Sequence, residues 1–183
     1  GLAVADFNDD GKMDVVKLNF QSSYALILLG NGDGTFSGFT YPSTGTFAFD
    51  VITADFNADG KQDMVYSLVN NDRLEVRLGN GDGTFANAVN YTTGSYPRNI
   101  GMGDIDGDGF VDLAVANQYG TSISILEGNG DGTFQAKCDQ TTAGGQWTMY
   151  VGNLDGSSKA DLAFITSVGN KLNVLKDPTP TVV

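Results

Sequence analysis

The sequence predicts an all-β protein made of four repeats, each a four-stranded antiparallel meander. Three observations support this fold class. The string GNGDGTF occurs at 30–36, 79–85 and 128–134, so the chain repeats itself every 49 residues. Between these turns, apolar and polar residues alternate with a period of two, as expected for strands with one buried face. No segment shows the sustained 3.6-residue apolar periodicity of an amphipathic helix.

The elements of one repeat can be assigned in the second unit. Residues 51–54 predict a short apolar strand, and residues 64–69 predict a second strand after an acidic loop. Residues 74–78 alternate Leu and Val with Glu and Arg, which indicates a third, half-buried strand. The glycine-rich turn then leads into a fourth strand at 85–91. Meanders repeated at roughly 40 to 50 residues are typical of β-propeller blades.

The blade boundaries follow from the repeat. The chain begins within the first strand of one blade and reaches the third strand of the fourth, so the last outer strand is absent or is formed by Thr181–Val183. An incomplete blade leaves unpaired backbone groups at a sheet edge, so we expect the rest of a larger propeller, or another copy of the chain, to complete the open edges. The expected blades are 1–45, 46–94, 95–143 and 144–177, with a tail or linker at 178–183.

Composition restricts the classes of partner. The 183 residues, 40% of them hydrophobic, are enough for a globular core. A formal net charge of -12 disfavours nucleic acid, because a phosphate backbone requires a Lys/Arg surface. No apolar segment approaches the roughly 20 residues that span a bilayer, and any export signal is expected to have been removed or to lie upstream of residue 1. The single cysteine, Cys138, excludes an internal disulfide and is expected to be buried in a strand.

The acidic segments of the repeat have the spacing of calcium-binding loops. They read DFNDDGKMD at 6–14, DFNADGKQD at 55–63, DIDGDGFVD at 104–112 and NLDGSSKAD at 153–161. Calcium takes about six to eight oxygen ligands, which a loop supplies with alternate side chains and a backbone carbonyl. Several like charges within nine residues repel one another unless a cation lies between them. The sequence therefore predicts calcium sites in these loops.

The motif positions identify the candidate ligands. Positions one, three, five and nine offer side chains, position seven offers its carbonyl, and a glycine at position six permits a sharp turn with positive φ. The fourth loop is a further candidate, with only two charged ligands and with Ser158 in place of the glycine. The candidate calcium ligands are Asp6, Asn8, Asp10, Lys12 and Asp14; Asp55, Asn57, Asp59, Lys61 and Asp63; Asp104, Asp106, Asp108, Phe110 and Asp112; and Asn153, Asp155, Ser157, Lys159 and Asp161.

An EF-hand does not explain the acidic loops. Its glutamate at position twelve is replaced by Lys17, Tyr66 and Val115, and its flanking helices are replaced by β-rich segments. A metal-free, aspartate-rich turn is the remaining alternative. The GNGDGTF segments are expected to be structural hairpin turns, because Asn-Gly and Asp-Gly are common turn dipeptides.

The strings DFNADGKQD at 55–63 and LGNGDGTF at 78–85 resemble the FG-GAP/VCBS repeats of bacterial secreted proteins, and the resemblance extends over all four units. Related repeats in integrin α-subunits form a seven-bladed propeller with calcium in equivalent hairpin loops, and fungal lectins of similar fold bind sugars. The resemblance implies a propeller of about seven blades with an adhesive or ligand-binding role. The literal FG and GAP strings of integrins are not evident here, so integrin partners are not carried over.

The two faces of such a propeller are expected to differ. The first-to-second and third-to-fourth strand connections lie on one face and carry the acidic loops and glycine-rich turns, which are nearly identical between units. The opposite face varies, and its aromatic and arginine side chains are typical anchors for partners. The alternative is that several of these side chains pack between blades. The candidate partner-binding residues are Tyr24, Phe47, Phe49, Tyr96, Arg98, Tyr119 and Trp147.

The predicted function is an extracellular, calcium-stabilised binding or adhesion module for a glycan or a protein. Millimolar extracellular calcium would fill even weak sites, so the calcium prediction favours a secreted or cell-surface protein. The alternative is a non-binding structural spacer or accessory domain of a larger secreted or surface protein. The sequence contains no histidine and no nucleophile elbow, and its carboxylates are concentrated in turns, so we do not expect an enzyme.

Overall fold

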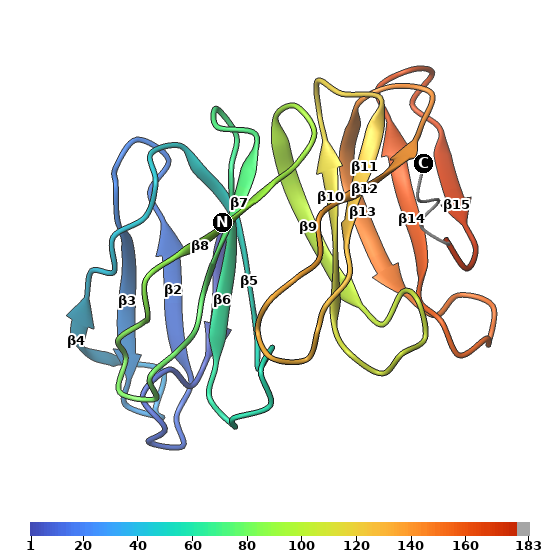
Figure 1. The fold of residues 1–183 in the computed structure, drawn as a ribbon. Helices are drawn as coiled ribbons and strands as arrows, with labels where there is room; N and C mark the ends of the chain where they lie inside the picture. Colours follow the sequence, from blue (N-terminus) through green and yellow to red (C-terminus); the bar gives the residue numbers. More distant parts are fainter. Residues whose placement is uncertain (179–183) are drawn as a thin grey trace.

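The computed structural model describes residues 1–178, which form fifteen strands in four antiparallel sheets (Figure 1). This confirms the predicted all-β class and its repeats. The predicted tail and the outer strand at Thr181–Val183 fall largely outside the described residues. The strands are β1 Leu2–Ala5, β2 Asp14–Leu18, β3 Ala25–Gly30, β4 Phe36–Thr40, β5 Ala48–Ala54, β6 Asp63–Leu68, β7 Arg73–Arg77, β8 Val89–Thr92, β9 Pro97–Gly103, β10 Asp112–Asn117, β11 Ser122–Leu126, β12 Cys138–Thr141, β13 Gln146–Gly152, β14 Asp161–Thr166 and β15 Leu172–Leu175.

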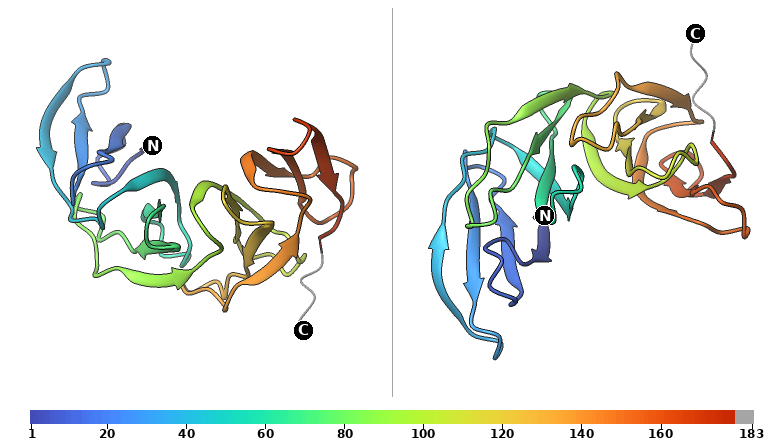
Figure 2. Two further views of the ribbon diagram at one scale, coloured as in Figure 1. Left: turned by 90° about the horizontal axis from the view of Figure 1, so that it is seen from above. Right: turned by 60° about the horizontal axis from the view of Figure 1, so that its bottom comes forward.

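Each sheet is a meander in which consecutive strands pair. The orders are β1-β2-β3-β4, β5-β6-β7-β8 and β9-β10-β11-β12, and the described part of the fourth sheet is β13-β14-β15. The sheets lie side by side along an open arc (Figure 2). The first strands β1, β5, β9 and β13 are neighbours of one another on the inner side of this arc. This is the arrangement of propeller blades around an axis.

The strand bounds in the second repeat differ at both ends from those predicted. β5 begins at Ala48, three residues before the predicted start, and β8 is confined to Val89–Thr92. Phe85 forms only an isolated bridge with Gly79. Its ring instead packs edge-on against Phe7 of the preceding blade, with 5.8 Å between the ring centroids. Contact with the neighbouring blade therefore takes this residue out of the continuous strand.

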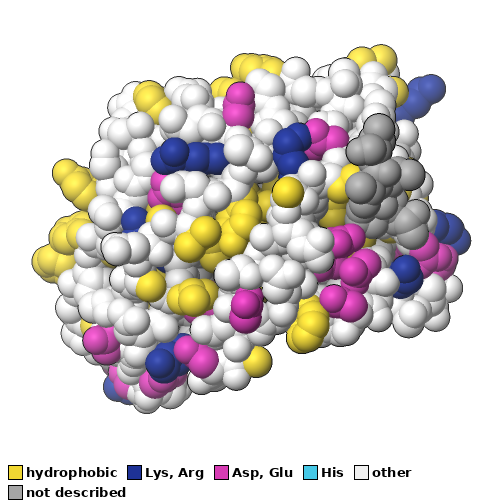
Figure 3. Space-filling view, viewed as in Figure 1, with side chains coloured by type: hydrophobic (Ala, Val, Ile, Leu, Met, Phe, Trp, Pro, Cys, Tyr) yellow, Lys and Arg dark blue, Asp and Glu magenta, His cyan; other side chains and the backbone are white. Residues whose placement is uncertain are grey.

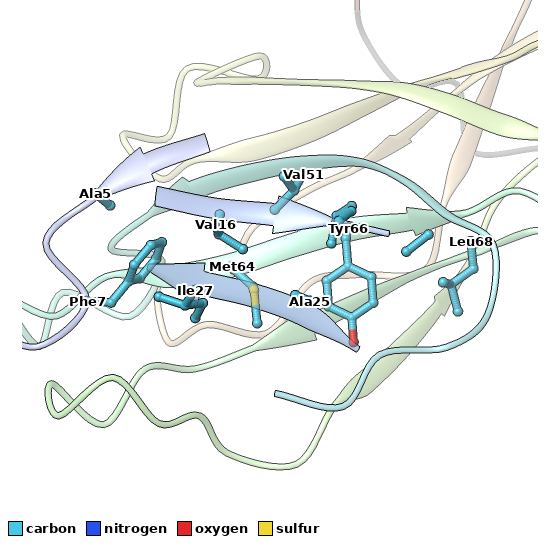
Figure 4. Packing of buried hydrophobic residues seen from close by; sticks show 11 residues of the cluster. Ala5, Phe7, Val16, Ala25, Ile27, Val51, Met64, Tyr66 and Leu68 are labelled. Atoms are coloured by element: carbon cyan, nitrogen blue, oxygen red, sulfur yellow. The ribbon is translucent and has the colours of Figure 1, made fainter. Parts of the chain in front are cut away.

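The apolar core lies between the blades and not within one. Between the first two sheets, buried side chains such as Val16 and Ile27 face Met64 and Tyr66 (Figure 4). Equivalent clusters lie between the second and third sheets and between the third and fourth. The prediction that β7 is half-buried was wrong for Glu75, which is 5% exposed and bonded to Tyr66. A middle blade has a neighbouring blade on each face. The alternation of apolar and polar residues along its strands therefore does not identify a face exposed to solvent.

Polar side chains connect the inner strands. The Asp50 carboxylate accepts hydrogen bonds from the side-chain amide of Asn99, at 2.9 Å, and from the backbone N–H of Ile100, at 3.0 Å. The Asn99 side-chain oxygen in turn accepts from the backbone N–H of Met149 at 2.7 Å. Asp50 and Asn99 occupy the same position of successive repeats. The side chains at this one repeat position therefore link three blades near the axis.

The outer faces of the first and last blades are apolar and exposed. Leu2 is 64% exposed, whereas Val51, one repeat later, is 4% exposed. At the other end Leu172 is 71% exposed, whereas its counterpart Leu74 is fully buried between blades. Residues 1–178 contain no helix long and apolar enough to cross a membrane.

Candidate functional site

The first acidic loop joins β1 to β2 and is organised by its own backbone. The Asp6 carboxylate accepts hydrogen bonds from the N–H groups of Asp10, at 3.2 Å, and Gly11, at 2.7 Å. The Asn8 side-chain oxygen also accepts from the Asp10 N–H at 3.2 Å, and the Asp10 carboxylate accepts from the Lys12 N–H at 3.0 Å. These bonds position the side chains at positions one, three and five of the loop.

The second loop repeats the same contacts. Asp55 accepts from the N–H groups of Asp59, at 3.1 Å, and Gly60, at 2.8 Å. Asn57 accepts from the Asp59 N–H at 3.1 Å, and Asp59 accepts from the Lys61 N–H at 2.9 Å. Since two separate segments adopt one hydrogen-bond pattern, the motif itself determines the conformation of the loop.

The backbone of these loops turns through left-handed residues. The glycine at position six has a φ of 85° at Gly60 and 92° at Gly109, which confirms the predicted positive φ. Position four is left-handed as well, which the sequence did not indicate, with a φ of 55° at Asp9 and 56° at Ala58. A side chain in this region costs about 1 to 2 kcal/mol, and the hydrogen bonds of the loop offset that cost.

The third loop brings three carboxylates together. One carboxylate oxygen from each of Asp104, Asp106 and Asp108 lies within 4.8 Å of the other two. Two ligands on opposite sides of a calcium ion are up to about 5 Å apart, so this spacing fits a shared ion. Within residues 1–178, no other set of three acidic, histidine or cysteine side chains converges in this way. The first two loops have an asparagine at position three, so each offers an amide oxygen there instead.

The aspartate at position nine is buried and fixed differently from the others. The Asp112 carboxylate accepts from the N–H of Ile105 with one oxygen and from the N–H of Gly128 with the other, both at 2.8 Å. It therefore ties the start of the acidic loop to the glycine-rich turn. The oxygen that accepts from Ile105 also accepts from the Asp106 N–H at 3.3 Å, whereas the oxygen that accepts from Gly128 keeps a second lone pair, so the ligand role stays a prediction. The equivalent donors are Phe7 and Gly30 for Asp14, Phe56 and Gly79 for Asp63, and Leu154 and Asp177 for Asp161.

Negative charge accumulates around the third loop. Burial raises the pKa of the Asp112 carboxyl, and the Asp106 carboxylate adds to this rise. Burial also raises the pKa of Glu127, and repulsion from Asp106, Asp112 and Asp108 raises it further. A cation bound among these carboxylates would relieve the repulsion, because an opposite charge stabilises their ionised forms.

The fourth loop has different contacts. Asn153 turns its side-chain amide nitrogen toward the carbonyl oxygen of Ser157, to which it donates a hydrogen bond. The Ser157 hydroxyl donates to the Lys159 carbonyl at 3.2 Å, and the Lys176 ammonium lies 3.3 Å from the Asp155 carboxylate. The backbone N–H of Ser157, and then Lys176, hold the pKa of Asp155 below its usual value. In the fourth loop, hydrogen-bond donors and an ammonium group therefore lie beside the positions whose counterparts in the other loops are candidate metal ligands.

The glycine-rich turns are closed by internal hydrogen bonds, which supports their structural interpretation. Asp33 accepts from the N–H of Thr35 at 2.9 Å and from its hydroxyl at 2.6 Å. The Asn31 side-chain amide donates to the same hydroxyl at 2.8 Å. The turns at 79–85 and 128–134 repeat these contacts.

Each glycine-rich turn also contacts the acidic loop of the preceding blade. The N–H of Gly83 donates to the carbonyl of Phe7 at 2.8 Å, and the N–H of Gly132 donates to the carbonyl of Phe56 at 3.0 Å. Loops and turns occupy the lower end of the molecule in Figure 1, and acidic side chains are most numerous over the lower half of Figure 3. The order of an acidic loop is thereby coupled to the contact between two blades.

At the opposite end, three candidate partner-binding residues form one stack. The guanidinium carbon of Arg98 lies 4.3 Å from the ring centroid of Phe49 and 5.8 Å from that of Trp147. Arg98 also donates to the side-chain oxygen of Gln118 at 3.1 Å. Phe49 and Arg98 are partly buried between blades, whereas Trp147 is 50% exposed. One set of residues thus both packs between blades and reaches solvent.

The remaining aromatic candidates lie in three ring contacts, of which one joins Phe47 to Phe20 with 5.4 Å between the ring centroids. Tyr96 stacks on Tyr119, with 4.3 Å between the ring centroids, and Tyr119 is 69% exposed. Phe47 and Tyr96 occupy the same repeat position, and both have a positive φ, of 65° and 60°. Bulky residues are rare there, so this backbone is locally strained. Tyr24 contacts Tyr41, an exposed ring that the sequence did not single out.

A family model for FG-GAP-like repeats matches residues 6–66, 55–115 and 104–164. The chain belongs to the FG-GAP-like repeat family. Each FG-GAP-like match begins at the first aspartate of an acidic loop and ends within the second strand of the following blade. One repeat of the family therefore includes the contact between two blades. No curated protein sequence matches the chain.

Solved structures with similar folds share little sequence with this FG-GAP-like chain. An Agrocybe aegerita lectin, described as recognising non-reducing terminal N-acetylglucosamine, aligns with a TM-score of 0.61 and 22% identity over 88% of this chain. The Photorhabdus luminescens Tc holotoxin pore aligns with a TM-score of 0.52 and 15% identity over 92% of this chain. The chain spans 45% of the lectin chain and 8% of the toxin chain. These similarities establish the propeller-like fold alone.

Two charged residues beside the FG-GAP-like loops were missed from the sequence. One position of the repeat is occupied by Leu29, Leu78, Glu127 and Lys176 in turn. Glu127 adds an acidic group beside the third loop, and Lys176 adds a basic group beside the fourth. The change from leucine to a charged residue at this repeat position could have indicated them. The position lies outside the nine-residue acidic motif, so the motif did not draw attention to it.

Proposed function

We propose that this chain is an extracellular, calcium-stabilised binding module that recognises a glycan or a protein. The convergence of carboxylate oxygens from Asp104, Asp106 and Asp108 within 4.8 Å carries the calcium part of the proposal. The shared hydrogen-bond pattern of the first two loops extends it to Asp6, Asn8 and Asp10 and to their counterparts Asp55, Asn57 and Asp59. The proposed location is the cell surface or the medium, where calcium is abundant.

The proposed role of calcium is structural. The acidic loops end at a buried aspartate that bonds the glycine-rich turn of the same blade, and they also contact the turn of the next blade through Phe7 and Gly83. An ion that orders a loop therefore also stabilises the interface between two blades. Acidic loops follow the last residues of β5, β9 and β13, whereas Phe49, Arg98 and Trp147 lie near the first residues of these strands. A calcium ion would therefore not contact a ligand bound at the stack.

The proposed ligand surface is the end that carries the Arg98 stack and the Tyr96–Tyr119 pair. Aromatic rings and arginine pack against sugar rings and peptide side chains with little loss of rotamer entropy, and they are common at binding hot spots. The lectin of similar fold makes a glycan the first ligand class to test. Its 22% identity does not transfer a sugar specificity.

The calcium part is tested by thermal unfolding with calcium and with excess chelator. We expect the melting temperature to fall on chelation and to recover when calcium, but not magnesium, is restored, because the oxygen-rich loops suit the larger ion. An unchanged melting temperature would overturn the calcium proposal.

The ligand part is tested on a glycan array and by pulldown from host-surface extracts. Trp147→Ala and Arg98→Ala are expected to lose the captured ligand, while the matched control Asn87→Ala, an exposed residue at the calcium end, keeps it. Folding of each variant is checked by its melting temperature in calcium. If no glycan or protein is captured by the folded wild-type chain, the spacer or accessory-domain role replaces the binding role.

We propose that further repeat units pack against the exposed apolar faces of the first and last blades. Leu2 and Leu172 occupy positions that are buried between blades elsewhere in the chain. Light scattering of the purified chain distinguishes a self-associating protein from a monomer. We also retain the proposal that the chain is not an enzyme; calcium-dependent turnover of a glycoside library would contradict it.

A further inference from the structure

We propose that the fourth acidic loop does not bind calcium and that Lys176 supplies its positive charge instead. This inference rests on the proposed calcium function of the first three loops. It concerns the one loop whose residues do not fit the ion, although its motif and its place in the blade are the same.

The first argument is the position of the ammonium group. Asp155 occupies motif position three, the position of Asp106 in the converging group of the third loop. In the fourth loop the Lys176 ammonium lies 3.3 Å from the Asp155 carboxylate. A calcium ion bound to Asp155 would have to displace or repel this ammonium. The lysines of the first two loops pair instead with position five, and position three there is an uncharged asparagine. The Lys176 pair therefore neutralises the one carboxylate that the fourth loop has at positions one, three and five.

The second argument is the loss of free acceptor groups. At position one, Asn153 has an amide in place of a carboxylate; its oxygen accepts from the Gly156 N–H at 2.6 Å, and its nitrogen donates to the Ser157 carbonyl. At position seven, the Lys159 carbonyl accepts from the Ser157 hydroxyl at 3.2 Å. Calcium binds oxygen acceptors and not N–H donors, so the Asn153 amide nitrogen cannot serve as a ligand, and position one of this loop offers a neutral oxygen in place of a carboxylate.

The third argument is the backbone. The glycine at position six is left-handed in the other three loops, with a φ of 80° at Gly11 and 85° at Gly60. Ser158 occupies this position in the fourth loop and does not have a positive φ. The fourth loop therefore does not make the turn that arranges the ligands of the others. This difference is independent of charge.

The loop nevertheless keeps its structural role. Asp161 is fully buried and accepts from the N–H groups of Leu154, at 2.8 Å, and Asp177, at 3.1 Å, as its counterparts do in the other blades. The Ser157 hydroxyl also lies 3.1 Å from the Asp177 carboxylate. The last blade thus closes its loop with the side chains of Lys176 and Asp177, which follow β15. Lysines also lie near a carboxylate in the first two loops, where Lys12 and Lys61 at position seven are 3.4 Å and 3.7 Å from Asp10 and Asp59 at position five. Among the described loops, the fourth is the one in which a lysine from outside the motif pairs with position three.

The test counts calcium ions bound per chain by equilibrium dialysis and calorimetry. The wild-type chain is expected to bind three ions, and Asp155→Asn is expected to leave that number at three. The matched variant Asp106→Ala in the third loop is expected to reduce it to two. Four ions in the wild type, or the loss of one ion on Asp155→Asn, would overturn the inference.

A gain-of-site variant tests the same inference in the opposite direction. Asn153→Asp, Ser157→Asp, Ser158→Gly and Lys176→Leu together give the fourth loop the residues of the others. We expect this folded variant to bind a fourth ion, and its binding only three would contradict the argument. A wild-type chain that binds no calcium would instead refute the proposed function, so the two failures are distinguishable.

Discussion

The third and fourth acidic loops share a place in the blade and differ in how they balance charge. Asp112 and Asp161 are both buried, and each bonds the same two backbone positions of its blade. Around the first, three carboxylates converge and Glu127 adds to the negative charge; beside the second, Lys176 pairs with Asp155. The comparison separates two roles within one motif. The buried aspartate maintains the blade, whereas the exposed positions determine whether a cation is needed.

The largest expected effect is the removal of calcium from the first three loops. A site filled at 100 times its dissociation constant stabilises the folded state by about 2.7 kcal/mol, so three sites contribute roughly 8 kcal/mol. Chelation should therefore lower the melting temperature and speed hydrogen exchange at Gly11, Gly60 and Gly109, while amides of residues 153–161 keep their protection. Equal loss of protection in all four loops would remove the distinction.

A smaller but still large effect is expected from truncating the buried aspartates. Asp112→Ala leaves the N–H groups of Ile105 and Gly128 without their partner, which costs about 3 kcal/mol in the free energy of unfolding. Asp161→Ala should cost somewhat less, because its donors are only partly buried. Both losses should be present in excess chelator, as measured by urea denaturation. An Asp161→Ala variant as stable as the wild type would show that the two carboxylates are not equivalent.

The next effect converts one residue of the third loop to its counterpart in the fourth. Asp108→Ser removes a converging carboxylate and should abolish one calcium site, with a loss of up to about 2.7 kcal/mol when calcium is at 100 times its dissociation constant. Calorimetry with calcium measures the missing ion. Asp131→Ser, in a glycine-rich turn, serves as a control and should leave the number of ions unchanged. A full set of ions in Asp108→Ser would exclude Asp108 as a ligand.

The smallest effect is expected from the ion pair of the fourth loop. Lys176 is 63% exposed, and exposed ion pairs contribute about 1 kcal/mol or less. Asp155→Asn should therefore change the free energy of unfolding by no more than this, equally with and without calcium, and less at high salt. A loss seen only in calcium would show that Asp155 binds the ion.

Much of the fold could be predicted from the sequence, because repetition constrains each element several times over. The strings at 30–36, 79–85 and 128–134 indicated the turns, and the glycines at position six indicated positive φ. Neighbouring blades decided the rest. Phe85 packs on Phe7 of the preceding blade and lies outside β8, and no pattern within one repeat records this contact. Glu75 is buried although it is charged, and it bonds Tyr66 of the adjacent strand.

The candidate site was predicted to a similar extent. The motif identified the aspartates that converge in the third loop, but it treated position nine as one ligand among others. Asp112 bonds Gly128, sixteen residues away, and this second role depends on strand pairing across the sheet. Stacking of Arg98 between Phe49 and Trp147 likewise requires three blades side by side.

The sequence by itself determined the repeat, the strand order within a blade and the acidic loops, because these depend on short-range spacing and backbone preference. Only the tertiary structure decided which loops suit a cation. Lys176 lies twenty-one residues beyond Asp155 in the chain, yet the pairing of β14 with β15 brings its ammonium to that carboxylate. Coulomb interactions depend on distance in space and not on separation in sequence, so four similar motifs need not form four similar sites.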